Sequence, residues 1–182
     1  DLVVEVPPLQ TRPKAALAGV GRHLILRPAV QKRHLVLAEP SLGLKLHFVN
    51  NERYDRKNGV SLLAAKKFID QECILSMADH LYSPEAVRRL MKFDLPKGAC
   101  ALGVDYDIER CFDLDDATKV RLENGKIVDI GKDIADYNCI DTGVFVCTPA
   151  LLDSLEEVLA ETGDASLSQG VSRLATTGRM TV

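Results

Sequence analysis

The strongest chemical signal in the sequence is a carboxylate that follows a buried-looking strand. Asp79 comes just after the apolar run 73–77, with His80 beside it. Open α/β sheets bind ligands at the carboxyl end of a central strand. A carboxylate there attracts a cation, and beside phosphates that cation is usually Mg²⁺. The competing interpretation is that Asp79 caps the turn into Ser83, and the spacing gives the two even weight.

A second polar group lies where a loop meets a helical pattern. Asn58, Gly59 and Ser61 stand at the start of an apolar pattern over 60–68. The backbone N–H groups of a helix N-terminus, with a hydroxyl and an amide, can bind a base, a ribose or a phosphate. Capping of the helix by Asn or Ser is the commoner explanation, and both interpretations stay open.

Cations and a further acid are spread along the rest of the chain. Lys14 precedes an Ala-rich run, Lys119 and Lys132 flank a predicted hairpin, and Asp141 with Gly143 opens a predicted strand. Glycine in a strand allows close approach of a ligand to the backbone, and an aspartate accepts hydrogen bonds from hydroxyls. Each residue alone is ambiguous. Together with Asp79 they suit a substrate that carries phosphates and hydroxyls.

The elements that must position these residues alternate along the chain. Short apolar runs predict buried strands at 2–4, 34–37, 44–49, 73–77 and 99–104. A helical apolar pattern covers 60–68.

Two further helices carry clear start signals. Ser83 followed by Pro84 and Glu85 places an N-cap, a proline and an acid at a helix start. Thr148-Pro149 opens another helix, which Gly163 ends.

The clearest local signal is a hairpin. Residues 118–123 and 126–130 alternate in polarity around Asn124-Gly125, the pair that a type I′ turn prefers. A strand at 140–147 follows. We therefore predict an α/β protein with a mostly parallel central sheet, helices on both faces and an inserted β-hairpin.

Composition narrows the function classes. The chain has 182 residues, 46% of them hydrophobic, with a formal net charge of −3. One domain is expected, and a polybasic nucleic-acid partner is not. No apolar run approaches the ~20 residues of a membrane helix. Five cysteines without short Cys-x-x-Cys spacing predict buried reduced thiols. With no leader pattern, these features favour a cytoplasmic location.

Five segments in this order resemble the inositol-1-phosphate cytidylyltransferase branch of the sugar-phosphate nucleotidyltransferase family. The resemblance covers the chain from about Leu44 onward, through residues 58–65, 75–83, 116–120, 125–132 and 140–145. It implies a Rossmann-like, GT-A-like nucleotidyltransferase fold, Mg²⁺ as cofactor, and CTP with an alcohol phosphate as substrates. L-myo-inositol-1-phosphate is the first choice of acceptor, which gives CDP-inositol and pyrophosphate.

The resemblance also assigns roles to the candidate residues. It implies that Asp79 binds the metal and that Lys14 is the signature lysine that holds phosphate. Nucleotide contacts are implied near Asn58, Gly59 and Ser61. The acceptor side is implied at Lys119, Lys132, Asp141 and Gly143, with Lys132 grouped with Lys14 and Asp79 as catalytic.

The sequence departs from this family at both ends. Residues 1–10 contain no glycine where the family has a Gly-rich phosphate loop, and the chain has no Trp for a late acidic motif. We therefore expect one nucleotidyltransferase domain over 1–182 that lacks these two parts. The family module is often joined to a membrane CDP-alcohol phosphatidyltransferase. Three alternatives stay open: another sugar-phosphate nucleotidyltransferase, a phosphocholine nucleotidyltransferase, or a non-catalytic nucleotide-binding subunit.

Overall fold

The computed structural model describes residues 2–6, 22–26, 45–77, 79–80 and 82–182. Two expectations, the strand at 34–37 and the phosphate-binding Lys14, lie outside these residues.

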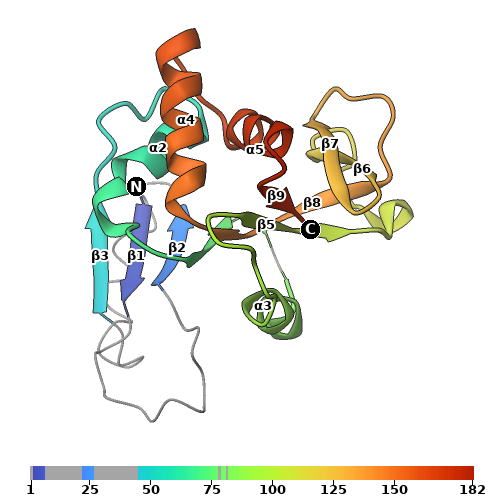
Figure 1. Cartoon of the computed structure of the whole chain (residues 1–182), viewed down its shortest axis with the longest axis horizontal. Helices are drawn as coiled ribbons and strands as arrows, with labels where there is room; N and C mark the ends of the chain where they lie inside the picture. The colour runs from blue at the N-terminus through green and yellow to red at the C-terminus, as the bar shows by residue number, and fades with distance from the viewer. Residues whose placement is uncertain (1, 7–21, 27–44, 78, 81) are drawn as a thin grey trace.

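A single sheet organises the described part of the chain (Figure 1). Its strand order is β3–β1–β2–β4–β8–β5–β9–β7–β6. The strands are β1 (Leu2–Val6), β2 (Arg22–Leu26), β3 (Lys45–Val49), β4 (Cys73–Met77), β5 (Cys100–Asp105), β6 (Lys119–Glu123), β7 (Lys126–Gly131), β8 (Cys139–Cys147) and β9 (Met180–Thr181).

Helices lie on both faces of this sheet, as predicted. In Figure 1, α2, α4 and α5 lie on one side and α3 on the other. The α-helices are α2 (Asn58–Ala64), α3 (Pro84–Met91), α4 (Pro149–Thr162) and α5 (Leu167–Thr176), and short 3₁₀ helices occupy Lys66–Phe68 and Ile108–Arg110. Among the described residues, no helix is both long enough and apolar enough to cross a membrane.

The sheet is mixed, which corrects the expected mostly parallel arrangement within a confirmed α/β class. Among the described pairings, β2–β4 and β5–β9 are parallel, whereas the others are antiparallel. The reason lies in β8, which runs antiparallel between β4 and β5. It is reached from the hairpin, not from the helical crossover that a parallel neighbour needs.

The predicted hairpin forms as β6 and β7. Asn124 and Gly125 both have positive φ, 51° and 73°, as a type I′ turn requires. The first strand of the hairpin also pairs with β8, where Lys119 lies opposite Ile140. The hairpin is therefore fixed to the centre of the sheet, and residues near its base lie beside the start of β8.

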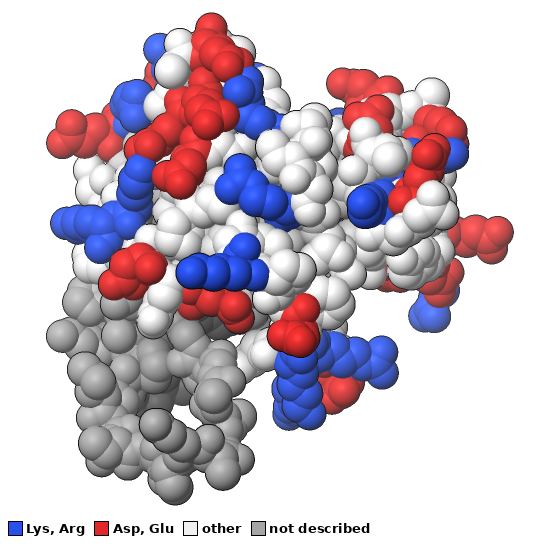
Figure 2. Space-filling view, in the orientation of Figure 1, with Lys and Arg blue, Asp and Glu red and all other residues white. Residues whose placement is uncertain are grey.

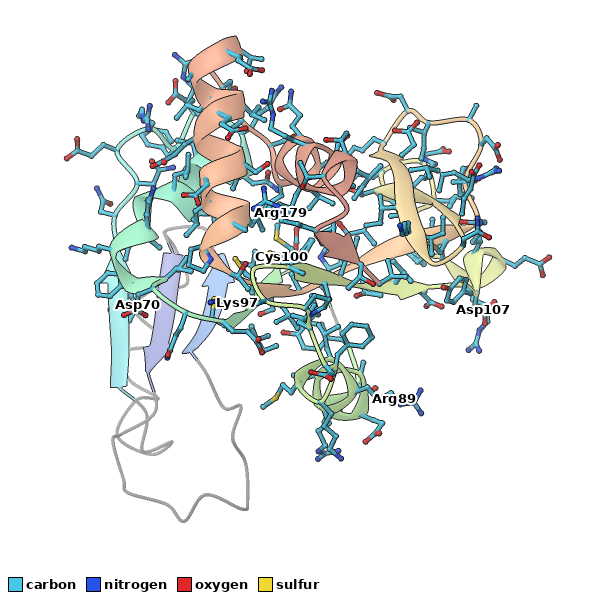
Figure 3. The ribbon with its side chains drawn as sticks, in the orientation of Figure 1. Asp70, Arg89, Lys97, Cys100, Asp107 and Arg179 are labelled. Atoms are coloured by element: carbon cyan, nitrogen blue, oxygen red, sulfur yellow. The ribbon has the colours of Figure 1, made fainter. Side chains whose placement is uncertain are left out.

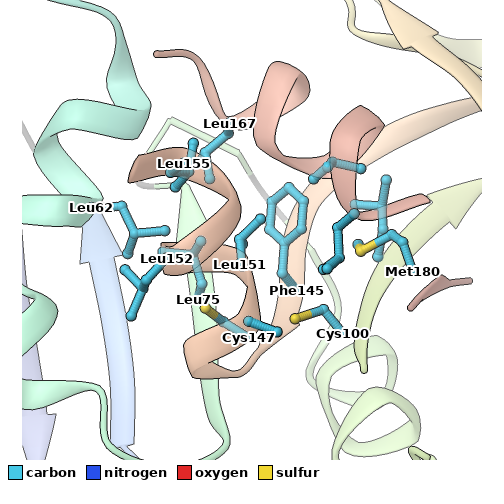
Figure 4. Packing of buried hydrophobic residues seen from close by; sticks show 14 of the residues in the cluster. Leu62, Leu75, Cys100, Phe145, Cys147, Leu151, Leu152, Leu155, Leu167 and Met180 are labelled. Carbon is cyan, nitrogen blue, oxygen red and sulfur yellow. The ribbon is translucent and has the colours of Figure 1, made fainter. Parts of the chain in front are cut away.

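The main core lies between the sheet and the α4 side (Figure 4). Leu155 of α4 is completely buried. It contacts two glycines, because a Cβ on Gly59 or on Gly170 would lie 2.7 or 2.6 Å from Leu155 Cδ2. Helices α2 and α5 therefore pack closely against α4 through positions without a side chain, and this packing brings their N-termini together.

Charged side chains of both signs are interspersed over the face drawn in Figure 2. This pattern matches the small net charge of −3. Arg89 of α3, labelled in Figure 3, is exposed, and its Nε lies 3.5 Å from Glu85 Oε1 of the same helix.

Candidate active site

One of the predicted carboxylates, Asp79, lies just after the end of β4. Ser76 of β4 pairs with Val144 of β8, so the residues after Met77 lie beside the bend in β8. There His80 Nδ1 lies 2.9 Å from Asp79 Oδ1. The Asp79 side chain is 80% exposed, which leaves its carboxylate accessible to a ligand.

Gly143 makes the bend in β8. Its φ is 74°, and its N–H donates to Asp141 Oδ1 at 2.7 Å. A Cβ at this position would lie 2.9 Å from His80 Cγ, so the imidazole ring packs directly on the glycine. The structure therefore links Asp79 to Asp141 indirectly, through contacts with His80 and Gly143.

Burial raises the pKa of Asp141 to about 6, although the N–H of Gly143 and the nearby His80 act in the opposite direction. The carboxyl is therefore mostly ionised at pH 7 and can accept hydrogen bonds from hydroxyl groups.

The two predicted lysines lie together on the hairpin side of this cluster. Lys119 Nζ donates to the backbone oxygen of Lys132 at 2.7 Å. Lys132 in turn forms an ion pair with Asp116, and this contact lowers the pKa of the Asp116 carboxyl. The backbone N–H of Asp141 donates to Thr118 O at 2.9 Å, which places the acid next to this lysine pair.

A cavity of about 1000 Å³ opens beside these lysines. Its walls come from the start of α2, the end of α4, the α5 helix and the end of β7 with the loop that follows it. They include Asn58, Thr118, Lys132, Ser166 and Arg173. Two residues predicted from separate segments, Asn58 and Lys132, therefore line one cavity.

Asn58 and Ser61 do not act as the N-caps that the alternative interpretation allowed. Lys57 precedes α2 without a side-chain cap. Asn58 Oδ1 instead accepts from Leu167 N at 2.9 Å. Ser61 Oγ accepts from Asn51 Nδ2 at 2.9 Å. Asn58 thus holds α2 to the start of α5, and Ser61 holds it to the loop that precedes it. Their contact with a nucleotide stays a prediction.

Gly59 has a packing role that the sequence did not reveal. A Cβ there would lie 2.6 Å from the backbone oxygen of Ala165, in addition to its contact with Leu155. Any larger residue would force α2 away from the chain that leads into α5.

The residues present fit a magnesium ion held mainly by substrate. Among the described residues, no group of three or more His, Cys, Asp or Glu side chains could hold a metal. Mg²⁺ usually binds through one or two carboxylates together with substrate phosphates and water. Asp79, exposed at the end of a strand, can supply such a single carboxylate.

Comparison with known proteins places the fold. No family model matches the sequence. An inositol-1-phosphate CTP transferase from T. maritima superposes with a TM-score of 0.71 at 28% identity, covering 85% of this chain and 62% of that one. UDP-glucose pyrophosphorylase complexed with UDP-glucose superposes with a TM-score of 0.62 at 14% identity, covering 86% of this chain and 65% of that one. The chain therefore has the Rossmann-like fold of nucleotidyltransferases.

Proteins of similar sequence indicate which branch of the nucleotidyltransferases this chain resembles. A bifunctional IPC transferase and DIPP synthase from Rubrobacter xylanophilus is 38% identical over 115 residues, which are 63% of this chain and 26% of that protein. One of the same name from Aquifex aeolicus is 30% identical over 178 residues, 88% of this chain and 40% of that protein. The chain thus spans between a quarter and two fifths of these relatives. These matches and the T. maritima structure support the inositol-1-phosphate cytidylyltransferase branch.

Proposed function

We propose that the chain transfers the cytidylyl group of CTP to inositol-1-phosphate, with CDP-inositol and pyrophosphate as products. The observation that supports this proposal is the placement of Lys132 in the wall of the cavity, with Lys119 bonded to its backbone oxygen and Asp141 hydrogen-bonded to Thr118, another residue of that wall. Asp79 lies nearby in the chain of contacts that runs through His80 and Gly143 to Asp141. The relatives' names supply the substrates.

The reaction needs positioning more than acid–base chemistry. An oxygen of the acceptor phosphate attacks the α-phosphorus of CTP, the new P–O bond forms, and the bond to pyrophosphate breaks. A phosphate monoester is largely ionised at pH 7, since its second pKa is about 6, so this nucleophile needs no general base. Bringing the two anions together is therefore the main task of the site.

The described residues divide this task. Asp79 would hold Mg²⁺, which when bound neutralises phosphate charge and orients the triphosphate. Lys132 would bind the acceptor phosphate after exchanging its contact with Asp116 for the substrate anion. Asp141 would accept hydrogen bonds from inositol hydroxyls, with Gly143 allowing the ring close to the backbone. Lys119 would hold the Lys132 loop in place.

On the nucleotide side, we assign Asn58, Gly59 and Ser61 to the surroundings of the cytidine. Asn58 lines the cavity that also contains Lys132, which supports this assignment. Lys14 would contribute phosphate binding from outside the described residues.

We further propose that the activity operates beside a membrane CDP-alcohol phosphatidyltransferase. The curated relatives combine an IPC transferase and a DIPP synthase in one protein, which supports such a partner. Buried thiols suit a reducing compartment, and we place the catalytic domain in the cytoplasm.

Pyrophosphate release tests the reaction class. The chain is incubated with Mg²⁺, inositol-1-phosphate and each nucleoside triphosphate in turn, and then with CTP and glucose-1-phosphate or phosphocholine. We expect release only with CTP and inositol-1-phosphate. Release with another acceptor would replace the assigned substrate. CTP binding without release from any pair would favour a non-catalytic nucleotide-binding subunit.

A further inference from the structure

His80 stands in a position that the proposed reaction does not yet use. Its Nδ1 lies 2.9 Å from Asp79 Oδ1, and its ring packs on Gly143. Both contacts come from residues at the same edge of the sheet, where β4 ends beside the bend in β8. His80 is itself 42% exposed, so it is not a core residue that packing alone would explain.

Asp79 needs such a partner to be ordered. Its side chain is 80% exposed, and an exposed carboxylate on a short side chain exchanges readily between rotamers. A donor held by a rigid neighbour restricts that choice. Gly143 provides the rigidity, because its N–H donates to Asp141 Oδ1 and the next residue, Val144, pairs with Ser76 of β4.

We propose that His80 is a positioning residue for Asp79: the ring, seated on Gly143, donates from Nδ1–H to Oδ1 and holds the carboxylate toward the incoming metal–phosphate complex. The catalytic consequence rests on the proposed function, but the hydrogen bond itself does not. The arrangement requires a protonated Nδ1 and a glycine at position 143. Metal-binding histidines are oriented by carboxylates in a comparable way, with the roles of the two side chains reversed here.

The proposal predicts different effects for two similar amide substitutions of His80, to asparagine and to glutamine. The amide nitrogen of asparagine can occupy the place of Nδ1, whereas that of glutamine occupies the place of Nε2. His80→Asn therefore keeps a donor to Asp79, and His80→Gln does not. We expect His80→Gln to weaken Mn²⁺ binding in the presence of CTP about tenfold, as loss of a hydrogen bond to a charged group predicts. His80→Asn should weaken it less than about threefold on the same grounds.

Substitution of Gly143 offers an independent check, because its effect on Mn²⁺ binding should depend on whether the His80 ring is present. Gly143→Ala adds a Cβ where the ring lies and should weaken Mn²⁺ binding as His80→Gln does. In a His80→Ala background the obstructing ring is gone, so the same glycine change should weaken binding less. Contacting residues show such non-additivity. If Gly143→Ala fails to fold because of its positive φ, the asparagine and glutamine pair still decides the question.

The experiment joins two readouts on the whole chain. ¹⁵N-histidine NMR without ligand reports the protonated nitrogen of His80, assigned by its loss in His80→Asn. Electron paramagnetic resonance measures the concentration of free Mn²⁺ in the presence of the chain and CTP, and so gives the Mn²⁺ affinity of each variant. A protonated Nδ1 whose signal shifts in Asp79→Ala, together with the asparagine–glutamine difference, supports the proposal.

Two results would overturn it: a ring protonated only at Nε2, or equal Mn²⁺ affinities in the asparagine and glutamine variants. If the NMR signature is present but the unaltered chain neither binds Mn²⁺–CTP nor turns over, the hydrogen bond stands and the proposed function fails.

Discussion

Asn58 accepts a hydrogen bond from the backbone N–H of Leu167 at 2.9 Å, which joins the first residue of α2 to the first residue of α5. Next to it, the N–H of Lys57 donates to Asp164 Oδ1 at 3.0 Å. Both helix starts border the cavity beside Lys132. The wall of the proposed site therefore depends on a contact between segments that are 109 positions apart.

Asn58→Ala should lower the free energy of unfolding by about 1–3 kcal/mol, because the Leu167 N–H loses its partner. Asn58→Asp keeps an oxygen acceptor and should lose much less. Urea denaturation of the two variants measures the difference. If both variants denature like the unaltered chain, the contact does not support the fold. A raised KM for CTP in Asn58→Asp, with stability retained, would show that the amide nitrogen contacts the nucleotide.

Because Lys132 and Asp116 form an ion pair, we expect substitutions of the two residues to have opposite effects on the KM for inositol-1-phosphate. Lys132→Ala should raise the KM for inositol-1-phosphate about tenfold or more, since it removes a charged phosphate ligand. Asp116→Ala should lower that KM, because the lysine no longer has a competing carboxylate. Melting temperatures should hardly change, since exposed ion pairs contribute little stability.

Lys126→Ala is the matched control for this pair, because Lys126 is an exposed lysine at the turn end of the hairpin. It should leave the KM unchanged. If Lys132→Ala behaves in the same way as this control, the acceptor phosphate binds elsewhere.

Asp141 predicts how stability depends on pH. Burial raises its pKa from 3.8 to about 6 in the folded chain. Between these values the folded state binds more protons than the unfolded state, so this group lowers stability as pH rises through the window. Asp141→Asn keeps an acceptor for the Gly143 N–H and should be more stable above pH 6, by at most about 3 kcal/mol. Near pH 4 and below, the two proteins should converge.

Chemical denaturation at several pH values measures this effect, and the variant should also lose turnover if Asp141 contacts the acceptor. An equal slope of stability against pH in both proteins would show that Asp141 has an ordinary pKa.

Buried thiols predict a simple labelling result. Of the five cysteines, only Cys111 is partly exposed, and the other four are buried. Burial raises the pKa of Cys139 to about 11. The contact with Cys73 and burial raise the pKa of the Cys147 thiol well above its ordinary value. Cys100 lies inside the core in Figures 3 and 4. A thiol reagent at pH 8 should therefore label one group quickly in the native chain and all five in denaturant.

Cys111→Ser should abolish the fast labelling phase. Two or more fast groups in the native chain would contradict the packing of the sheet against α4.

Local signals in the sequence predicted much of this fold. Asn124-Gly125 predicted the hairpin turn, Ser83-Pro84 the start of α3, and Gly163 the end of α4, where it adopts φ 76°. In each case the deciding interaction lies within a few residues. Helix α5 was missed, although Ser166 and Gln169 form a capping box that the Ser-x-x-Gln spacing could have indicated.

Strand direction and side-chain partners could not be predicted in this way. Whether β8 runs parallel to β4 depends on the path of the chain between them, and the hairpin makes that path. The partners of Asn58 and Ser61 lie in other segments, so their role in holding α2 carries no local signature. Likewise, the sequence marked Asp79 and Gly143 separately, but only the fold shows that His80 lies between them.

Formation of CDP-inositol tests the central claim most directly. The chain is incubated with CTP, L-myo-inositol-1-phosphate and Mg²⁺, and ³¹P NMR follows the products, with Asp79→Asn as the parallel variant. The account predicts paired resonances of a new diphosphate diester together with pyrophosphate in equal amounts, and loss of most of both in Asp79→Asn while its melting temperature is retained. Product formed equally well by Asp79→Asn would contradict the metal role of Asp79, and absence of the diester from the unaltered chain would contradict the reaction itself.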